Sequence, residues 1–155
     1  MQPSEKYRHF VDAEGEPLNR LLSAVERVVL HRFRGALRDR GHRVIAAAQM
    51  QALQQLSQGG LRISTLAGRL HLSKQAVGQL VRGLEGEGLV RSTVDPTDGR
   101  ARLVSPTAAG LELVSGAVDA IRGIEADLGR DIGHAALREL KRSLGRILER
   151  AGRGE

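Results

Sequence analysis

The polar residues between positions 74 and 86 have the types and spacing that suit contact with nucleic acid. At about 100° per residue, the apolar side chains of this stretch recur on one face of a helix. The opposite face consists of Gln75, Gly78, Gln79, Arg82 and Gly86. This face has no acidic residue and little bulk. It therefore suits a groove that is lined with phosphates and base edges.

A short helix over residues 63–70 and a tight turn precede this face. Ser73 is well placed as the N-cap of the second helix, because its hydroxyl can accept a hydrogen bond from an unpaired backbone amide. The pattern predicts a helix-turn-helix whose second helix enters the DNA major groove. Taken alone, the same stretch also fits an ordinary helical hairpin.

A β-hairpin is predicted directly after the second helix. Residues 89–94 and 102–105 have the character of strands, and the turn between them contains Pro, two Asp and Gly. This arrangement is the winged form of the helix-turn-helix. Arg100 leaves the hairpin tip, where a guanidinium can enter a narrow minor groove, and Asp98 is near enough to hold it as a bidentate partner. The alternative is a surface hairpin with a solvated ion pair.

The segment LAGRLHLSKQAVGQLVRGLEGEGLV, followed by DPTDGRARLV and TAAG, resembles the MarR family of bacterial transcription regulators. The resemblance extends over about residues 17–150. It implies a homodimer on a pseudo-palindromic operator, often with a small-molecule inducer. It also makes Arg100 the wing arginine and Asp98 its carboxylate partner. The positions that it places against the major groove are Ser73, Lys74, Gln75, Gly78 and Gln79.

Base reading is expected from a few side chains of this set. Gly78 would let the backbone approach DNA closely but reads no base. Specificity should therefore depend on Lys74, Gln75 and Gln79 together with Arg100, since Gln pairs with adenine and Lys with guanine in the major groove. Arg82 is assigned to a phosphate.

The charge of the chain is unevenly distributed. The 155 residues carry a formal net charge of +6. Residues 17–60 contain seven basic and two acidic residues, and residues 61–105 contain seven and four, whereas residues 106–155 balance eight with eight. A polyanionic partner for the basic part is the simplest interpretation, although an arginine-rich proteome would also explain the total.

Several function classes are disfavoured by what the sequence lacks. Without cysteine there is no disulfide, thiolate metal site or cysteine-based redox sensing. The five His lack metal-ligand spacing, and neither a nucleophile–base pair nor a phosphate-binding loop is present. We therefore expect no metal, no cofactor and no enzymatic activity. Because no apolar run approaches a membrane span or a signal region, we expect a cytoplasmic, nucleoid-associated protein.

Helical stripes on both sides of the winged core predict a dimerisation frame. Residues 1–16 are expected to form a loose arm, and a helix should run from Pro17 to about Arg40 and stop at Gly41. Two further helices are expected over about residues 107–128 and 135–151. The apolar face of the first is wide, which favours burial between its own core and a partner subunit. The expected dimerisation residues are Leu111, Val114, Val118, Leu140, Leu144 and Ile147.

An effector pocket between the frame and the winged core would be lined by His31, Arg32 and Met50. A small anionic or aromatic effector would suit it. Arg32 lies on the apolar side of its helix, where a charge needs a partner, so a structural ion pair is the alternative to a ligand contact. The helix over residues 44–57 is expected to supply the core with Ile45, Ala48, Met50, Leu53 and Leu56.

Together these patterns predict a mainly α protein with a small β-hairpin wing: a winged helix-turn-helix core flanked by N- and C-terminal dimerisation helices. The expected divisions are an arm at 1–16, the N-terminal dimerisation helix at 17–43, the DNA-binding domain at 44–105 and the C-terminal dimerisation helices at 106–155. The predicted function is a sequence-specific transcriptional repressor relieved by a small ligand. The alternatives are an architectural DNA-binding protein with little sequence preference and no inducer, and a winged-helix domain that binds protein.

Overall fold

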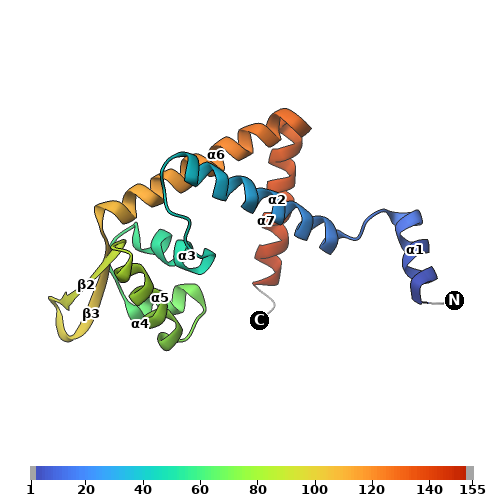
Figure 1. Ribbon diagram of the computed structural model, residues 1–155. Coiled ribbons are helices and arrows are strands. Elements are labelled where there is room, and N and C mark those ends of the chain that lie inside the picture. The colour runs from blue at the N-terminus through green and yellow to red at the C-terminus, as the bar shows by residue number, and fades with distance from the viewer. Residues whose placement is uncertain (1–2, 153–155) are drawn as a thin grey trace.

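Two long helices, α2 and α6, form the frame of the molecule in the computed structural model, which describes residues 3–152 (Figure 1). α2 (Leu18–Asp39) starts directly after Pro17 and ends just before Gly41, whose φ of +75° stops the helix as predicted. α6 (Ala108–Ile132) starts at Thr107, whose hydroxyl accepts a hydrogen bond from the Gly110 amide at 3.1 Å. It runs four residues beyond its expected end.

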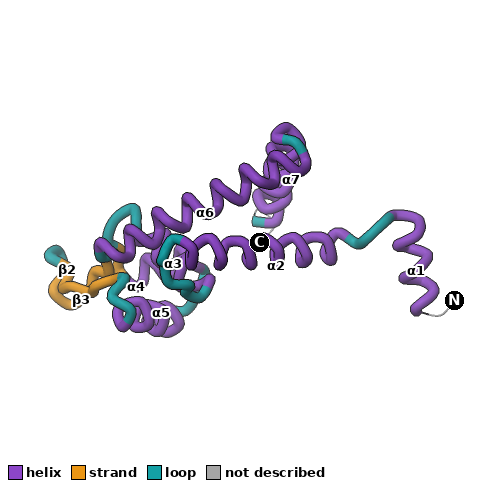
Figure 2. The backbone as a smooth tube through the Cα atoms, turned by 45° about the horizontal axis from the view of Figure 1, so that its top comes forward, coloured by secondary structure: helices purple, strands orange, loops and turns teal. Residues whose placement is uncertain are grey.

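Two further helices, α7 and α1, lie outside this pair in the chain. After Gly133, at a φ of +89°, the chain reverses into α7 (His134–Ala151), which packs on α6. At the other end of the chain, α1 (Pro3–Glu14) lies away from the rest of the molecule (Figure 2). The prediction of a loose arm is therefore wrong for residues 3–14. The apolar residues at positions 7, 10 and 11 have helical spacing, and no Gly or Pro interrupts residues 4–14.

The elements from α3 to β3 form a winged lobe at one end of the frame. Its helices are α3 (Ala47–Leu56), α4 (Ile63–Leu70) and α5 (Lys74–Gly86), and its antiparallel sheet has the order β1-β3-β2. The helix-turn-helix and the wing hairpin are confirmed. The strand β2 (Val90–Asp95) has the predicted length but starts one residue later, and β3 (Asp98–Pro106) is longer than predicted. β1 (Leu61–Arg62) was not predicted, because two residues are too few to show an alternating pattern.

The hydrophobic core lies inside the winged lobe, where the end of α2 meets α3, α4, α5 and β3. Its fully buried side chains are Leu37, Leu53, Leu56, Leu66, Val77, Leu84 and Val104. The predicted burial of Met50, Leu53 and Leu56 is confirmed. Ala48, which was also predicted to be in the core, is exposed, and Ala52 is buried instead. The two alanines lie one turn apart on α3, and only the later turn is covered.

A tight joint connects the lobe to α6. The Thr107 hydroxyl donates a hydrogen bond to the Gly88 carbonyl at 2.7 Å, and the Thr107 amide donates one to the Leu89 carbonyl at 3.0 Å. A Cβ atom on Gly110 would lie 2.1 Å from the Leu89 oxygen, so only glycine permits this close approach. The segment that follows α5 and the start of α6 are therefore held together by hydrogen bonds to the carbonyls of Gly88 and Leu89.

Replacing Leu53 with Ala should destabilise the protein by about 2–5 kcal/mol, because it removes a fully buried side chain and leaves a cavity. The free energy of unfolding from urea titration measures this loss. Val94→Ala is the matched control: Val94 is 59% exposed on the wing, and its truncation should change stability by less than about 0.5 kcal/mol. Equal losses in the two variants would show that the core does not lie at Leu53.

Candidate nucleic-acid interface

The turn between α4 and α5 sets the direction of α5, which is the helix predicted to enter the DNA major groove and is called the recognition helix from here on. His71 ends α4 in the left-handed conformation, with a φ of 53°, and its amide donates to the Gly68 carbonyl at 3.3 Å. Ser73 then caps α5, because its hydroxyl accepts a hydrogen bond from the Ala76 amide at 3.1 Å. The predicted N-cap is confirmed. The three residues 71–73 are enough to redirect the chain from one helix to the other.

α5 divides into a buried face and an open face. Val77, Val81 and Leu84 are buried against the lobe. The open face presents side chains that are all exposed and that form no hydrogen bond or ion pair with any residue from 3 to 152: Lys74, Gln75, Gln79 and Arg82. Between them, Gly78 has no side chain, so the helix backbone is accessible there. A Cβ at this position would lie 3.6 Å from the Arg82 guanidinium. The structure thus brings these five predicted positions onto one accessible surface.

The wing projects beside this surface (Figure 1). Asp95 pairs with Asp98 across a turn of two residues, and the strand register is irregular between Val94 and Asp95. Arg100 lies on β3, but its side chain is outside the described part of the structure. The pairing of Asp98 with Arg100 therefore stays a prediction. The ion pair that the structure does show for Asp98 is with Arg62 Nη1, at 3.6 Å.

Asp95 is the one charged side chain among the described residues that is buried, with 6% of its surface exposed. Its carboxylate accepts hydrogen bonds from the Thr97 hydroxyl and the Thr97 amide, both at 2.7 Å, and from Arg62 Nε at 2.6 Å. These donors favour the ionised form. In that order they lower the pKa of Asp95 from 3.8 to about 2, against the opposing effect of burial.

Sequence reasoning missed this network. Arg62 occupies the N-cap position of α4, yet its side chain caps nothing. The one local signal is that an arginine occupies this position, where Ser, Thr, Asp or Asn is the usual N-cap. Its partner lies 33 residues away in the sequence, which no local pattern reveals.

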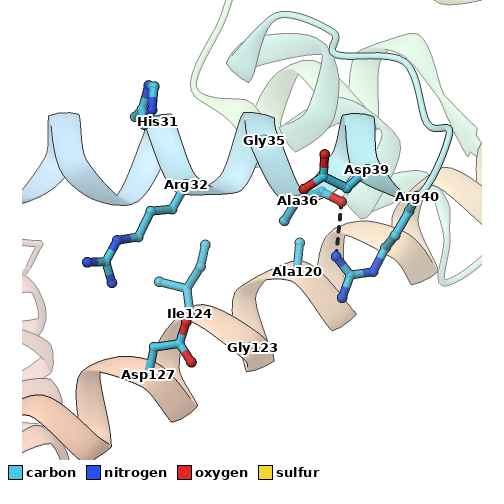
Figure 3. A pocket seen from close by; sticks show the side chains of 10 residues that line it. All are labelled: His31, Arg32, Gly35, Ala36, Asp39, Arg40, Ala120, Gly123, Ile124 and Asp127. Carbon is cyan, nitrogen blue, oxygen red and sulfur yellow. Dashed lines mark hydrogen bonds between the residues drawn. The ribbon is translucent and has the colours of Figure 1, made fainter.

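The three predicted effector residues do not share a pocket. His31 and Arg32 belong to a cavity of about 480 Å³ between α2 and α6, whose floor includes Ala36 and Ala120. In Figure 3, His31 points away from α6 and Arg32 lies at the edge of the cavity. Both side chains are exposed. Arg32 has no ion-pair partner among residues 3–152, and because it is in contact with water it does not need the structural ion pair that the sequence suggested. Met50 lines a different cavity.

The Met50 cavity, of about 220 Å³, lies between α2, α3 and α6. Its lining is mostly apolar and includes Val29, Phe33 and Ile121, with Arg34 as the single charged residue. The described residues contain no cluster of three His, Asp or Glu that could hold a metal ion. Within the same residues, no helix is both long and apolar enough to cross a membrane.

The predicted dimerisation residues lie on partly open apolar surfaces. Leu111 and Val118 on α6 are exposed, as are Leu140 and Ile147 on α7, whereas Val114 and Leu144 are half-buried. α7 has no buried residue at all. A further exposed apolar face, which the predicted set did not include, lies on α2: Leu18, Leu21, Leu22, Val25 and Val28.

Comparisons with known proteins agree with this geometry. Residues 45–101 match the model of the MarR family. The S. aureus MepR–DNA complex superposes with a TM-score of 0.68 at 21% identity, covering 86% of this chain and 98% of MepR. MepR bound to ethidium bromide gives a TM-score of 0.59 at 22% identity, covering 88% and 97%. The regulator Tm0710 from Thermotoga maritima gives 0.60 at 28% identity, covering 87% and 96%. No curated protein matches the chain.

The fold and the open face of α5 define a winged helix-turn-helix protein. Its winged lobe is similar to the MarR family over residues 45–101, and the solved structures that share the fold include the transcriptional regulator Tm0710.

Acid titration should reveal the Asp95 network. Because the folded pKa of about 2 lies below the ordinary 3.8, ionised Asp95 stabilises the fold fully above about pH 4, and this contribution is lost as the pH falls towards 2. Asp95→Asn should be less stable at pH 7 and should lose less further stability between pH 4 and pH 2. Urea midpoints at pH 7, 4, 3 and 2 measure both effects. Asp119→Asn, at an exposed site on α6, is the control; parallel pH curves for wild type and Asp95→Asn would contradict the assignment.

Proposed function

We propose that the protein is a homodimeric transcriptional repressor that binds a pseudo-palindromic DNA site and releases it when a small molecule binds. The observation that carries the proposal is the open face of α5, whose polar and basic side chains have no partner within residues 3–152. Donor groups left free on a rigid helix suit a ligand rich in acceptors, as base edges and phosphates are. The likeness to MepR in its DNA complex supports the same use of this surface.

Each residue of the interface has a proposed role. Lys74, Gln75 and Gln79 read base edges in the major groove, and Gly78 lets the helix approach closely. Arg82 binds a phosphate. The Ser73 hydroxyl accepts from the Ala76 amide, so its own proton remains available to donate to a second phosphate. Arg100 enters the minor groove beside the wing.

The homodimer is proposed from the apolar faces that a single chain leaves exposed. Leu148 on α7 is 72% exposed and Leu18 on α2 is 61% exposed, and both belong to stripes along their helices. Contiguous apolar surface of this kind marks a protein interface. A two-fold pairing through α2, α6 and α7 would cover these faces and present two recognition helices to successive major grooves, roughly 34 Å apart. Residues 17–43 and 106–155 would then form the dimerisation frame around the DNA-binding domain at 44–105.

The effector site is proposed at the Met50 cavity, because it lies where the frame meets the winged lobe. α2 and α6 line it from the frame and α3 lines it from the lobe. A small aromatic or anionic molecule that fits one arrangement of these helices better than another would shift the spacing of the two recognition helices. MepR has been solved with ethidium bromide, which supports small-molecule binding in this fold. His31 and Arg32, at the cavity inside the frame, remain a second candidate site.

Selection of bound duplexes from a random DNA pool tests the proposal. We expect enrichment of an inverted repeat whose half-sites are separated by about one helical turn. Binding without any enriched site would favour an architectural DNA-binding protein. The dependence of affinity on salt adds a second criterion: phosphate contacts require log K to fall steeply with log salt, and a flat dependence would indicate a protein partner instead.

Arg100→Ala should weaken binding to the selected duplex by about 1–3 kcal/mol, the range for an arginine that contacts a base edge. The thermal midpoint should stay within a few degrees of wild type, because position 100 lies near an exposed hairpin tip. Fluorescence anisotropy at fixed salt measures the affinity. Unchanged binding would remove Arg100 from the DNA interface.

Ile147→Glu should dissociate the dimer, since it places a charge in the proposed apolar interface. Ile147 is 55% exposed in the single chain, so the substitution leaves the core of the subunit intact. Light scattering at micromolar protein should then give the mass of one chain. Arg142→Glu, which introduces the same side chain on the charged face of α7, is the control and should remain dimeric. A dimeric Ile147→Glu variant would contradict the proposed interface.

A further inference from the structure

We propose that Arg62 is a positioning residue that fixes the wing relative to the recognition helix, so that Arg100 reaches the minor groove. This inference rests on the proposed DNA-binding function and assigns to Arg62 no DNA contact of its own. It concerns a residue that lies in neither the recognition helix nor the wing hairpin, but at the junction of β1 and α4.

All three guanidinium nitrogens of Arg62 are directed at the wing tip. Nε donates to Asp95 at 2.6 Å, Nη2 donates to the Thr97 hydroxyl at 3.3 Å, and Nη1 lies 3.6 Å from the Asp98 carboxylate. The three partners span the whole turn between β2 and β3. Because the guanidinium is planar, with its donors at fixed angles, these contacts set the orientation of the tip as well as its distance.

The backbone of Arg62 is itself held in place. It pairs with Leu103 in the sheet and immediately precedes α4, which packs against α5 and contributes the buried Leu66 and Ala67 to the core. A continuous path of packed elements therefore runs from the recognition helix through α4 to Arg62. The side chain of Arg62 extends this path to the tip of the wing.

The tip has few other supports. Pro96, Thr97, Asp98 and Gly99 are exposed, and Val94 just before them is 59% exposed. The strand register is irregular at Val94 and Asp95, just before the turn. Asp95 is the residue of this region that is buried, and Arg62 is its partner outside the turn. Loss of Arg62 would leave a twisted two-stranded tip with no side-chain link to α4 in the network described.

Charge adds a second reason for an arginine at this position. Asp95 and Asp98 place two carboxylates on a wing that would lie against DNA phosphates. Arg62 offsets part of this negative charge and is 40% exposed at the side chain. Geometry and charge can be separated by Arg62→Lys, which keeps the charge but has a single nitrogen that cannot meet three partners at once.

The first test uses the free protein. Amide hydrogen exchange of the segment 95–103 should become at least about tenfold faster in Arg62→Lys than in wild type, while exchange within α5 stays unchanged. The matched control is Arg43→Lys, which alters an exposed ion pair with Glu87, 3.1 Å long, at the C-terminal end of α5. Unchanged exchange at the tip in Arg62→Lys would overturn the proposal. Should Arg62→Lys fold poorly, Thr97→Val removes two of the bonds in the same network and gives the same readout.

The second test is a double-mutant cycle on the selected duplex. Arg62→Lys should weaken binding about tenfold when Arg100 is present and less than about twofold in the Arg100→Ala background, since a positioning residue acts through the residue that it positions. A purely structural role would give the same loss in both backgrounds, and that additive result would refute the proposal. Amide exchange needs no DNA, so a failure to select any duplex, with the exchange response intact, would count against the proposed function rather than against the link made by Arg62.

Discussion

A carboxylate that is withdrawn from water must find donors, and in this protein that requirement joins the wing to the helix-turn-helix. Asp95 is buried at the end of β2, and the donors that keep it ionised come from Thr97 in the turn and from Arg62 ahead of α4. The network forms only when β1, α4 and the hairpin are all in place. The surface of α5 and the wing beside it are therefore parts of one folded unit, whose separation is set by the fold.

The frame, unlike the winged lobe, leaves apolar faces of its helices exposed to water. The lobe encloses its own core, but α2 and α7 carry apolar side chains that the single chain does not cover. Hydrophobic surface of this extent is favourable only when a second molecule removes it from water. In the proposed dimer, the pairing that buries these faces also sets the distance between the two recognition helices. The Met50 cavity lies where frame and lobe meet, so a molecule bound there would act on the contact through which the frame holds the lobe.

Much of the fold follows from short-range patterns. Ser73 was identifiable as an N-cap, and Gly41 as a stop, because each acts through hydrogen bonds or backbone angles within a few residues of itself. The helical character of residues 3–14 was missed although the spacing of their apolar residues allowed it. β1 was missed because two residues have no period, and its strand character depends entirely on its pairing with β3.

The sequence by itself determined the class of protein, the polar face of α5 and the presence of a wing, since these depend on periodicity and on turn residues. Only the tertiary structure decided which partners those residues meet. It paired Asp98 with Arg62, it buried Asp95, and it separated Met50 from His31 and Arg32. The physical reason is distance along the chain: Arg62 and Asp95 are 33 residues apart, and their contact exists only because the packing of the lobe brings β1 to the wing.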